Sequence, residues 1–164
     1  MPLLENGRIV ADDWVHVPDD APCPTDGAVI VSFARVEEAL ARPGAAPVGV
    51  RLNPDTDVVT LNTVLPRLGL VNVDFPGFRD GRAFTQARAL REHLHFTKEI
   101  RATGHALPDQ YEFMLRCGIT TVEIAENADP SVWEKAHTRF TVAYQPSVLN
   151  EKSQGFGLRR FLDA

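Results

Sequence analysis

The sequence predicts an α/β protein built on a parallel sheet of about five strands flanked by helices. From residue 28 onward, short apolar β-branched runs alternate with stretches whose apolar residues recur at helical spacing. Each connection is long enough for the crossover that parallel pairing requires. The first expectation is a three-layer sandwich, and the alternative is the open half of a β/α barrel, which uses the same local units.

The N-terminal residues 1–27 predict a β-rich arm. Two short β-rich pieces, Arg8–Ala11 and Trp14–Val17, are separated by Asp12-Asp13. A turn-rich segment with three prolines follows at 18–27. This pattern is typical of a hairpin-like arm.

Five apolar runs are the predicted strands of the sheet. They are Ala28–Phe33, Val48–Leu52, Leu70–Phe75, Glu99–Thr103 and Thr121–Ala125. We expect residues 1–146 to form a single domain that includes the arm, and residues 147–164 to form a polar C-terminal tail.

Helical spacing of apolar residues predicts the connecting helices. A short helix through Val36 and Ala39 follows the first run, and Asp57–Leu65 has helical spacing before Pro66. The clearest amphipathic pattern has Ala83, Phe84, Ala87, Leu90 and Leu94 on one side. The last two helices are predicted at Pro108–Cys117 and after Asp129-Pro130, where a capping carboxylate precedes a first-turn proline and Trp133 and Phe140 lie on the apolar side.

The composition excludes several classes of protein and site. The 164 residues are 44% hydrophobic and 24% charged with a net charge of −5, which removes the overall basic charge of a nucleic-acid-binding domain. No apolar run approaches the roughly 20 residues of a membrane span, and no secretory signal is apparent, so we expect a cytoplasmic protein. Cys23 and Cys117 stand alone, and we propose no metal. The usual dinucleotide, P-loop, hydrolase-elbow and zinc-protease motifs are missing, so the cofactor stays unknown.

A candidate site follows from the rule that ligands of parallel α/β sheets bind beyond the carboxyl ends of the strands. The loop after the third predicted strand, at 74–82, combines glycines, arginines and carboxylates, and the next such loop begins with Thr103-Gly104-His105. Asp74 and His105 are the candidates for proton transfer. The candidate anion-binding residues are Arg79, Gly81, Arg82, Thr103 and Gly104. The alternative is a structural loop in which Asp74 accepts hydrogen bonds and Arg79 forms a solvated ion pair.

Several segments carry a resemblance to a known family. The opening MPLLENGRIVADDWVHVPDD, the central DFPGFRDGRAFTQARALRE, EIRATGHALPDQYEFMLRCGI and the closing AYQP resemble the uncharacterised bacterial family called domain of unknown function 934. The resemblance covers residues 1 to about 146. The resemblance implies a gene neighbourhood, because members of the family are commonly encoded beside the sulfite reductase haemoprotein and other sulfate-assimilation enzymes of proteobacteria. Some members carry the label of probable oxidoreductase.

Two functional hypotheses therefore stay open. The first is an accessory or assembly protein of assimilatory sulfate or sulfite reduction that associates with the sulfite reductase haemoprotein. The second is a small oxidoreductase, an enzyme acting on an anionic metabolite, or a sensor, with an arginine-lined site. Pairing of two copies along an exposed sheet edge is a further expectation.

Overall fold

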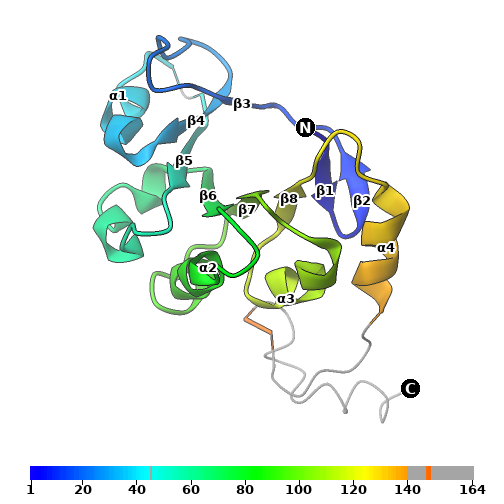
Figure 1. The fold of residues 1–164 in the computed structure, drawn as a ribbon. Helices are drawn as coiled ribbons and strands as arrows, with labels where there is room; N and C mark the ends of the chain where they lie inside the picture. Colours follow the sequence, from blue (N-terminus) through cyan, green and yellow to red (C-terminus); the bar gives the residue numbers. More distant parts are fainter. Residues whose placement is uncertain (45, 140–146, 149–164) are drawn as a thin grey trace, which may run out of the picture.

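The computed structural model describes residues 1–44, 46–139 and 147–148. These residues form one eight-stranded sheet in the order β2-β1-β8-β7-β6-β5-β4-β3, with helices packed along it (Figure 1). The strands are β1 (Leu3–Glu5), β2 (Arg8–Val10), β3 (Trp14–His16), β4 (Ala28–Ser32), β5 (Val48–Leu52), β6 (Leu70–Phe75), β7 (Glu99–Gly104) and β8 (Thr121–Glu123). The α-helices are α1 (Val36–Leu40), α2 (Arg82–Glu92), α3 (Tyr111–Arg116) and α4 (Pro130–Thr138). Four 3-10 helices complete the described elements: η1 (Phe33–Arg35), η2 (Val58–Leu61), η3 (Leu65–Arg67) and η4 (Pro108–Gln110).

The predicted parallel sheet is confirmed, with more strands than the five expected. β3 to β8 are parallel neighbours in chain order, and all five predicted strands are among them. The N-terminal arm supplies the additional strands. The expected hairpin between its two β-rich pieces is wrong, because β2 pairs antiparallel with β1 while β3 pairs parallel with β4 at the opposite edge of the sheet.

This placement of the arm requires the sheet to curl. β2 and β3 are the two outermost strands, yet Val10 and Trp14 are only four residues apart in the chain. Four extended residues span at most about 14 Å. Eight strands laid flat at about 4.8 Å spacing would separate the edges by about 34 Å. The short link is therefore compatible only with a strongly curved sheet, and the half-barrel is the arrangement that forms.

The helices cover one face of this sheet, on the outside of the curve (Figure 1). Alternate strand residues such as Val50, Val73 and Ile100 join the main apolar core with helix residues such as Leu90 and Met114. Because β3 to β8 are neighbours in chain order, crossovers of one hand place every helix on the same side, whereas a doubly wound sandwich needs a reversal of strand order. The observed fold is thus the half-barrel alternative.

The helix predictions are confirmed with local differences. Residues 57–65 form η2 and the start of η3 in place of one α-helix, since β-branched residues crowd the first turn and Pro66 interrupts the second. The predicted 108–117 helix begins as η4 before α3. The Asp129 side chain accepts a hydrogen bond from the Ser131 amide at 2.9 Å and caps α4 as expected. Phe140 and the predicted tail from residue 149 onward lie outside the described residues.

In the described part of the chain, none of the helices has the length and apolar character needed to span a bilayer.

Candidate functional site

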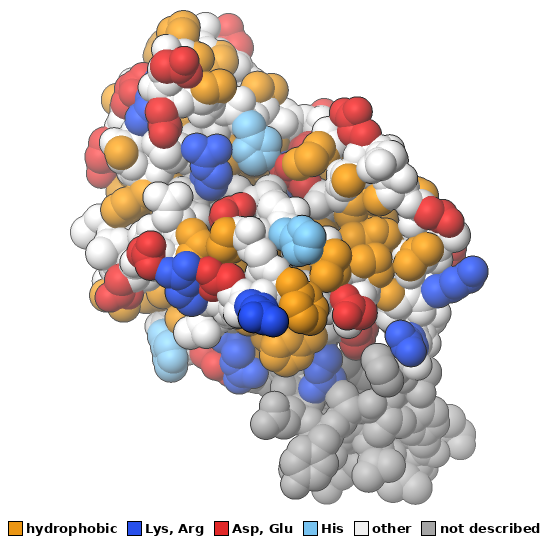
Figure 2. Space-filling view, in the orientation of Figure 1, with side chains coloured by type: hydrophobic (Ala, Val, Ile, Leu, Met, Phe, Trp, Pro, Cys, Tyr) orange, Lys and Arg blue, Asp and Glu red, His pale blue; other side chains and the backbone are white. Residues whose placement is uncertain are grey.

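The inner face of the sheet, which is the face turned away from the helices, changes character along the strands. Toward the amino ends of β4 to β6 it carries apolar side chains: Ile30 and Leu70 are buried, lie outside the main core, and flank Gly49. At the amino ends of β7 and β8 it carries the polar residues Glu99 and Thr121. Toward the carboxyl ends of β3 to β8, which we call the carboxyl rim, strand alternation places polar residues on the inner face. They are His16, Ser32, Arg51, Asn72, Asp74, Arg101, Thr103 and Glu123. Figure 2 shows histidine, basic and acidic side chains close together over the region of these strands.

A buried ion network occupies one side of this face. The Arg101 side chain is fully buried, and its Nη1 and Nη2 atoms donate to the two Asp12 carboxylate oxygens at 2.8 and 2.9 Å. The same guanidinium reaches Glu99 at 3.0 Å and Glu123 at 3.1 Å. His16 Nε2 lies 2.6 Å from Glu123 Oε1. Arg101 therefore forms ion pairs with three carboxylates. Through their contacts with Arg101 and Glu123, the arm residues Asp12 and His16 connect the arm and β3 to β7 and β8.

The ionisation of this network follows from its contacts. Burial alone raises the pKa of the Glu123 carboxyl, but hydrogen bonds from His16 and Arg101 and their charges more than offset it, so the pKa lies below its ordinary value. The pKa of Asp12 is lowered in the same way, since hydrogen bonds from Arg101 and the Trp14 amide outweigh burial. Both carboxylates are thus held in their charged form at neutral pH.

Asp74 belongs to a different group at the rim. Asn72 Nδ2 donates to Thr103 Oγ1 at 2.9 Å, and Thr103 hydrogen-bonds the Asp74 carboxylate. Burial raises the pKa of Asp74 above its ordinary value, although the Arg51 charge and the Thr103 hydrogen bond oppose that shift. A partly buried carboxyl with a raised pKa is suited to proton transfer.

Gly104 allows the close approach of β6 and β7 at this point. Its φ is +85°, and a Cβ atom there would lie 2.5 Å from the Phe75 carbonyl oxygen and 2.7 Å from Asp74 Oδ1. Only glycine adopts this conformation without strain and leaves that space. The residue is therefore needed for the local geometry of the strand ends around Asp74.

Arg51 and Ser32 lie on the inner face without partners among the described residues. They are register neighbours on β5 and β4. The Ser32 hydroxyl oxygen is buried and makes no hydrogen bond within the described chain. The Arg51 guanidinium is partly buried, and it has no hydrogen bond or ion pair to any residue that the structure describes. These two groups are available to a ligand.

The structure brings some of the predicted site residues together. β6 and β7 are parallel neighbours, with Asp74 opposite Thr103 and Phe75 opposite Gly104. Both loops therefore start from the same rim. His105 is exposed, and its backbone N–H donates to the Phe75 carbonyl at 2.6 Å.

The two arginines of the 74–82 loop differ in their contacts, because Arg82 is paired with carboxylates and Arg79 is exposed. Arg82 Nε donates to Asp80 Oδ1 at 2.9 Å, and its Nη1 pairs with Asp55. The side-chain and backbone hydrogen bonds from Arg82 lower the pKa of Asp80 to about 2. Gly81 is the N-cap of α2, and Arg79 is exposed in the turn before it. The Arg82 fork is thus already occupied by two carboxylates.

Sequence reasoning missed most of the inner face. Asn72, Arg101, Arg51, Glu123 and His16 were not among the predicted site residues. A signal for them exists, because strands β6 and β7 alternate apolar and polar residues, whereas strands covered on both faces read as continuous apolar runs. Polar alternation within parallel strands indicates a polar, uncovered inner face.

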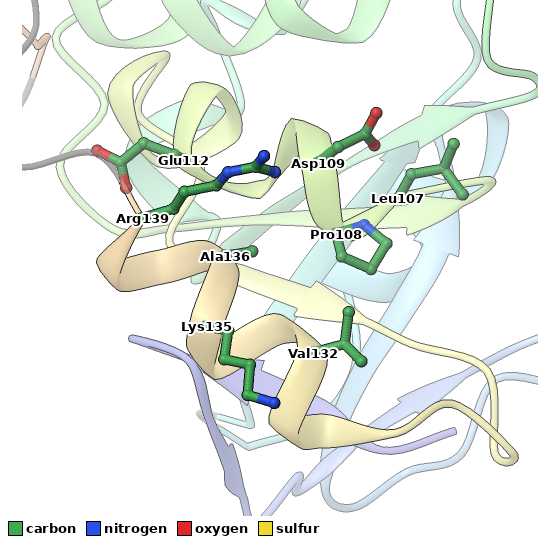
Figure 3. A pocket seen from close by; sticks show the side chains of 8 residues that line it. All are labelled: Leu107, Pro108, Asp109, Glu112, Val132, Lys135, Ala136 and Arg139. Carbon is green, nitrogen blue, oxygen red and sulfur yellow. The ribbon is translucent and has the colours of Figure 1, made fainter.

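A second surface feature is an apolar groove of about 580 Å³ between η4 and α4 (Figure 3). The residues that line it are Leu107, Pro108, Asp109, Glu112, Val132, Lys135, Ala136 and Arg139. Val132 is 46% exposed, and Phe113 on α3 is 50% exposed. Figure 2 shows hydrophobic side chains gathered over α3 and toward α4.

Comparison with known proteins identifies the family. No curated protein matches the chain. A family model described as "Bacterial protein of unknown function (DUF934)" matches residues 49–154, which include β5 to β8 and α2 to α4. The match covers more than half of the chain and agrees with the resemblance in the FRDGR and RATGH segments. The chain therefore belongs to the DUF934 family of bacterial proteins.

Proposed function

We propose that the protein binds a small metabolite at the carboxyl rim of its half-barrel. The observation that carries this proposal is the set of Ser32, Arg51 and Asp74 on the inner face. Two of these residues lack partners among the described residues, and the third is a carboxyl with a raised pKa. Polar and charged groups are costly to bury unless they are satisfied, so groups of this kind at one rim favour a ligand that satisfies them.

The position within the fold supports the same proposal. In β/α barrels, ligands bind at the carboxyl ends of the parallel strands, and here the inner face of β4 to β6 changes from apolar to polar toward that end. This support is an analogy with the architecture of other proteins, and it does not identify a reaction. An enzyme, such as the oxidoreductase that the resemblance implies, and a sensor would both bind their ligand at this site. Only the enzyme would convert the ligand to a product.

The buried network of Arg101 is assigned a supporting role. Its members contact one another: Arg101 binds Asp12, Glu99 and Glu123, and His16 contacts Glu123. The network holds β3 against β8, and Asp74 and Arg51 lie on the same inner face of the sheet. The metabolite itself contacts the opposite side of the inner face.

A binding screen tests this proposal. Sulfite, sulfate, phosphosulfate nucleotides and flavins, with a neutral sugar and a polyamine added, are tested for a rise in melting temperature of the full chain, because ligands that bind the native state stabilise it. Amide chemical shifts then locate binding. We expect at least one compound to stabilise the chain and shift amides at residues 32, 51, 74 and 103. The absence of any stabilising compound, or shifts confined to other surfaces, would overturn the proposal.

The apolar groove favours a second candidate function, which is association with the sulfite reductase haemoprotein as an accessory or assembly protein. Its support is the exposed apolar surface around Val132 and Phe113, together with the sulfate-assimilation setting that the resemblance implies. Partner surfaces typically combine such an apolar centre with a polar margin, here including Lys135 and Asp109.

Co-elution with the purified haemoprotein tests this second candidate. Val132→Asp should abolish co-elution, whereas Val59→Asp, at a 59% exposed valine of η2, should leave it unchanged. Equal co-elution of both variants, or no co-elution of the wild type, contradicts the docking proposal. Self-association that Val132→Asp removes would instead assign the groove to a second copy of the chain.

A further inference from the structure

We propose that the ligand of the carboxyl rim is a small anion, carrying a carboxylate or a sulfur or phosphorus oxyanion, and that Arg51 and Ser32 bind this group. The inference rests on the proposed function and specifies its ligand class. It places the anion subsite on β4 and β5, away from the 79–82 turn that the sequence pattern favoured.

The arginines of the inner face and the carboxyl rim differ in their counterions. Arg79 is exposed and, like Arg51, has no ion pair within the described residues. Arg101 contacts three carboxylates, and Arg82 contacts two. Arg51 has no ion pair within the described residues, although it lies on the same sheet face as Asn72, its register neighbour on β6. Arg51 is a partly buried residue with a cationic guanidinium, so a matching anion stabilises it.

The charge of Arg51 acts on the Asp74 carboxyl, which also interacts with Thr103. Asp74 hydrogen-bonds Thr103, and its raised pKa shows that burial outweighs the attraction of Arg51. The charges of Arg51 and Asp74 therefore interact, but the two side chains do not form an ion pair with a nitrogen-to-oxygen distance of 4 Å or less. Asp74 is thus placed to exchange a proton or hydrogen bond with a ligand that Arg51 holds.

The Ser32 hydroxyl is a second group suited to binding the anion. Its oxygen is buried and unpartnered among the described residues, and it faces the same side of the sheet as Arg51 one strand away. Neighbouring strands are about 4.8 Å apart, which suits two donors that bind different oxygens of one anion. A hydroxyl donor beside a guanidinium fork selects oxygen-rich anions over halides, because each donor is directional.

A cationic ligand does not fit this face equally well. Asp12, Glu99 and Glu123 all contact the guanidinium of Arg101, and no carboxylate forms an ion pair with Arg51 within the described residues. Adding a cation beside Arg51 would also introduce like-charge repulsion. The Arg51 guanidinium and the Ser32 hydroxyl therefore favour a ligand of negative charge.

Binding measurements on the full chain test the assignment. Sulfite, phosphate and malonate are titrated into the wild type and into Arg51→Gln, Arg51→Lys, Ser32→Ala and Arg79→Gln, with a neutral sugar and a polyamine as comparison ligands. Arg79→Gln is the matched control, since Arg79 is an exposed arginine at the same end of the sheet. Thermal unfolding confirms that each variant is folded.

We expect at least one of the three anions to bind the wild type, and its affinity to fall about tenfold or more in Arg51→Gln, because hydrogen bonds to charged groups are the strong ones. Ser32→Ala should lose several-fold and Arg51→Lys should be intermediate, since lysine keeps the charge and loses the fork. Arg79→Gln should bind as the wild type does. Should Arg51→Gln fail to fold, Arg51→Lys and Ser32→Ala decide the outcome.

The outcomes distinguish this inference from the proposed function. If only the sugar or the polyamine binds at the inner face, or if an anion binds there equally well to the Arg51 and Ser32 variants, the ligand class is wrong and the metabolite site stands. If nothing binds at the inner face, both are wrong. Among the three anions, the relative affinities separate carboxylates from oxyanions of sulfur and phosphorus.

Discussion

His16 and Glu123 are 107 positions apart in the chain, and their side chains meet at 2.6 Å between Nε2 and Oε1. His16 is on the edge strand β3, whereas Glu123 is on β8, third from the opposite edge. Only a curved sheet brings these strands together. The Glu123 side chain is 5% exposed and that of His16 is 35% exposed, so a buried carboxylate fixes an imidazole that solvent still reaches.

A double-mutant cycle measures how strongly this contact closes the half-barrel. We expect His16→Ala and Glu123→Gln to be each destabilising, with a coupling free energy of about 0.5–3 kcal/mol because the residues share one network. Urea unfolding of the two single variants and the double variant gives the value. Strict additivity of the two effects would show that the contact contributes nothing to closure.

Removal of Arg101 tests the network as a whole. Arg101→Met leaves three carboxylates facing one another in a buried place, and we expect a loss of about 3–5 kcal/mol in the free energy of unfolding. Arg88→Met, which breaks the surface pair with Glu92 at 2.8 Å, should cost less than about 1 kcal/mol. Similar losses in both variants would contradict the assignment of Arg101 as the centre of the network.

The lowered pKa values of Glu123 and Asp12 predict loss of stability in acid. A carboxyl whose folded pKa lies below its unfolded value contributes stability above the unfolded value, here 4.5 for Glu123 and 3.8 for Asp12. That contribution disappears as the pH falls through the lowered folded values. The free energy of unfolding, measured by urea from pH 7 to pH 3, should decline more steeply in the wild type than in Asp12→Asn/Glu123→Gln. Parallel declines would show that these carboxyls do not carry the effect.

Asp74 predicts a pH effect of the opposite sign. Its raised folded pKa means that the folded protein bears the ionised carboxyl at a cost once the pH exceeds the unfolded value of 3.8. Asp74→Asn should therefore be more stable than the wild type at pH 7, and this advantage should vanish near pH 3. Asp13→Asn, at an exposed position of the arm, serves as the control and should be neutral at both pH values. A destabilised Asp74→Asn at pH 7 would mean that the Thr103 hydrogen bond matters more than burial.

Gly104 and Gly77 form a matched pair for the geometry of the rim. Gly104→Ala should destabilise the protein by about 1–3 kcal/mol, because its positive φ is strained for alanine and the methyl group would meet the Phe75 carbonyl. Gly77→Ala, where an added Cβ meets nothing within 4 Å, should lie within about 0.5 kcal/mol of the wild type or slightly above it. Calorimetric melting of both variants decides, and equal melting temperatures would contradict the crowding at Gly104.

The local pattern determined the five strands β4 to β8, the amphipathic α2, the Asp129 cap, and the juxtaposition of Asp74 with Thr103. Hydrophobic period and capping act over a few residues, and parallel neighbours in chain order place consecutive strand ends at one rim. The tertiary structure alone decided the curl of the sheet, the pairing of Arg82 with Asp55, and the lack of a carboxylate partner for Arg51 within the described residues. Those outcomes depend on contacts between residues from 27 to 107 positions apart. Such contacts form only after every strand has found its register, which no short window of sequence specifies.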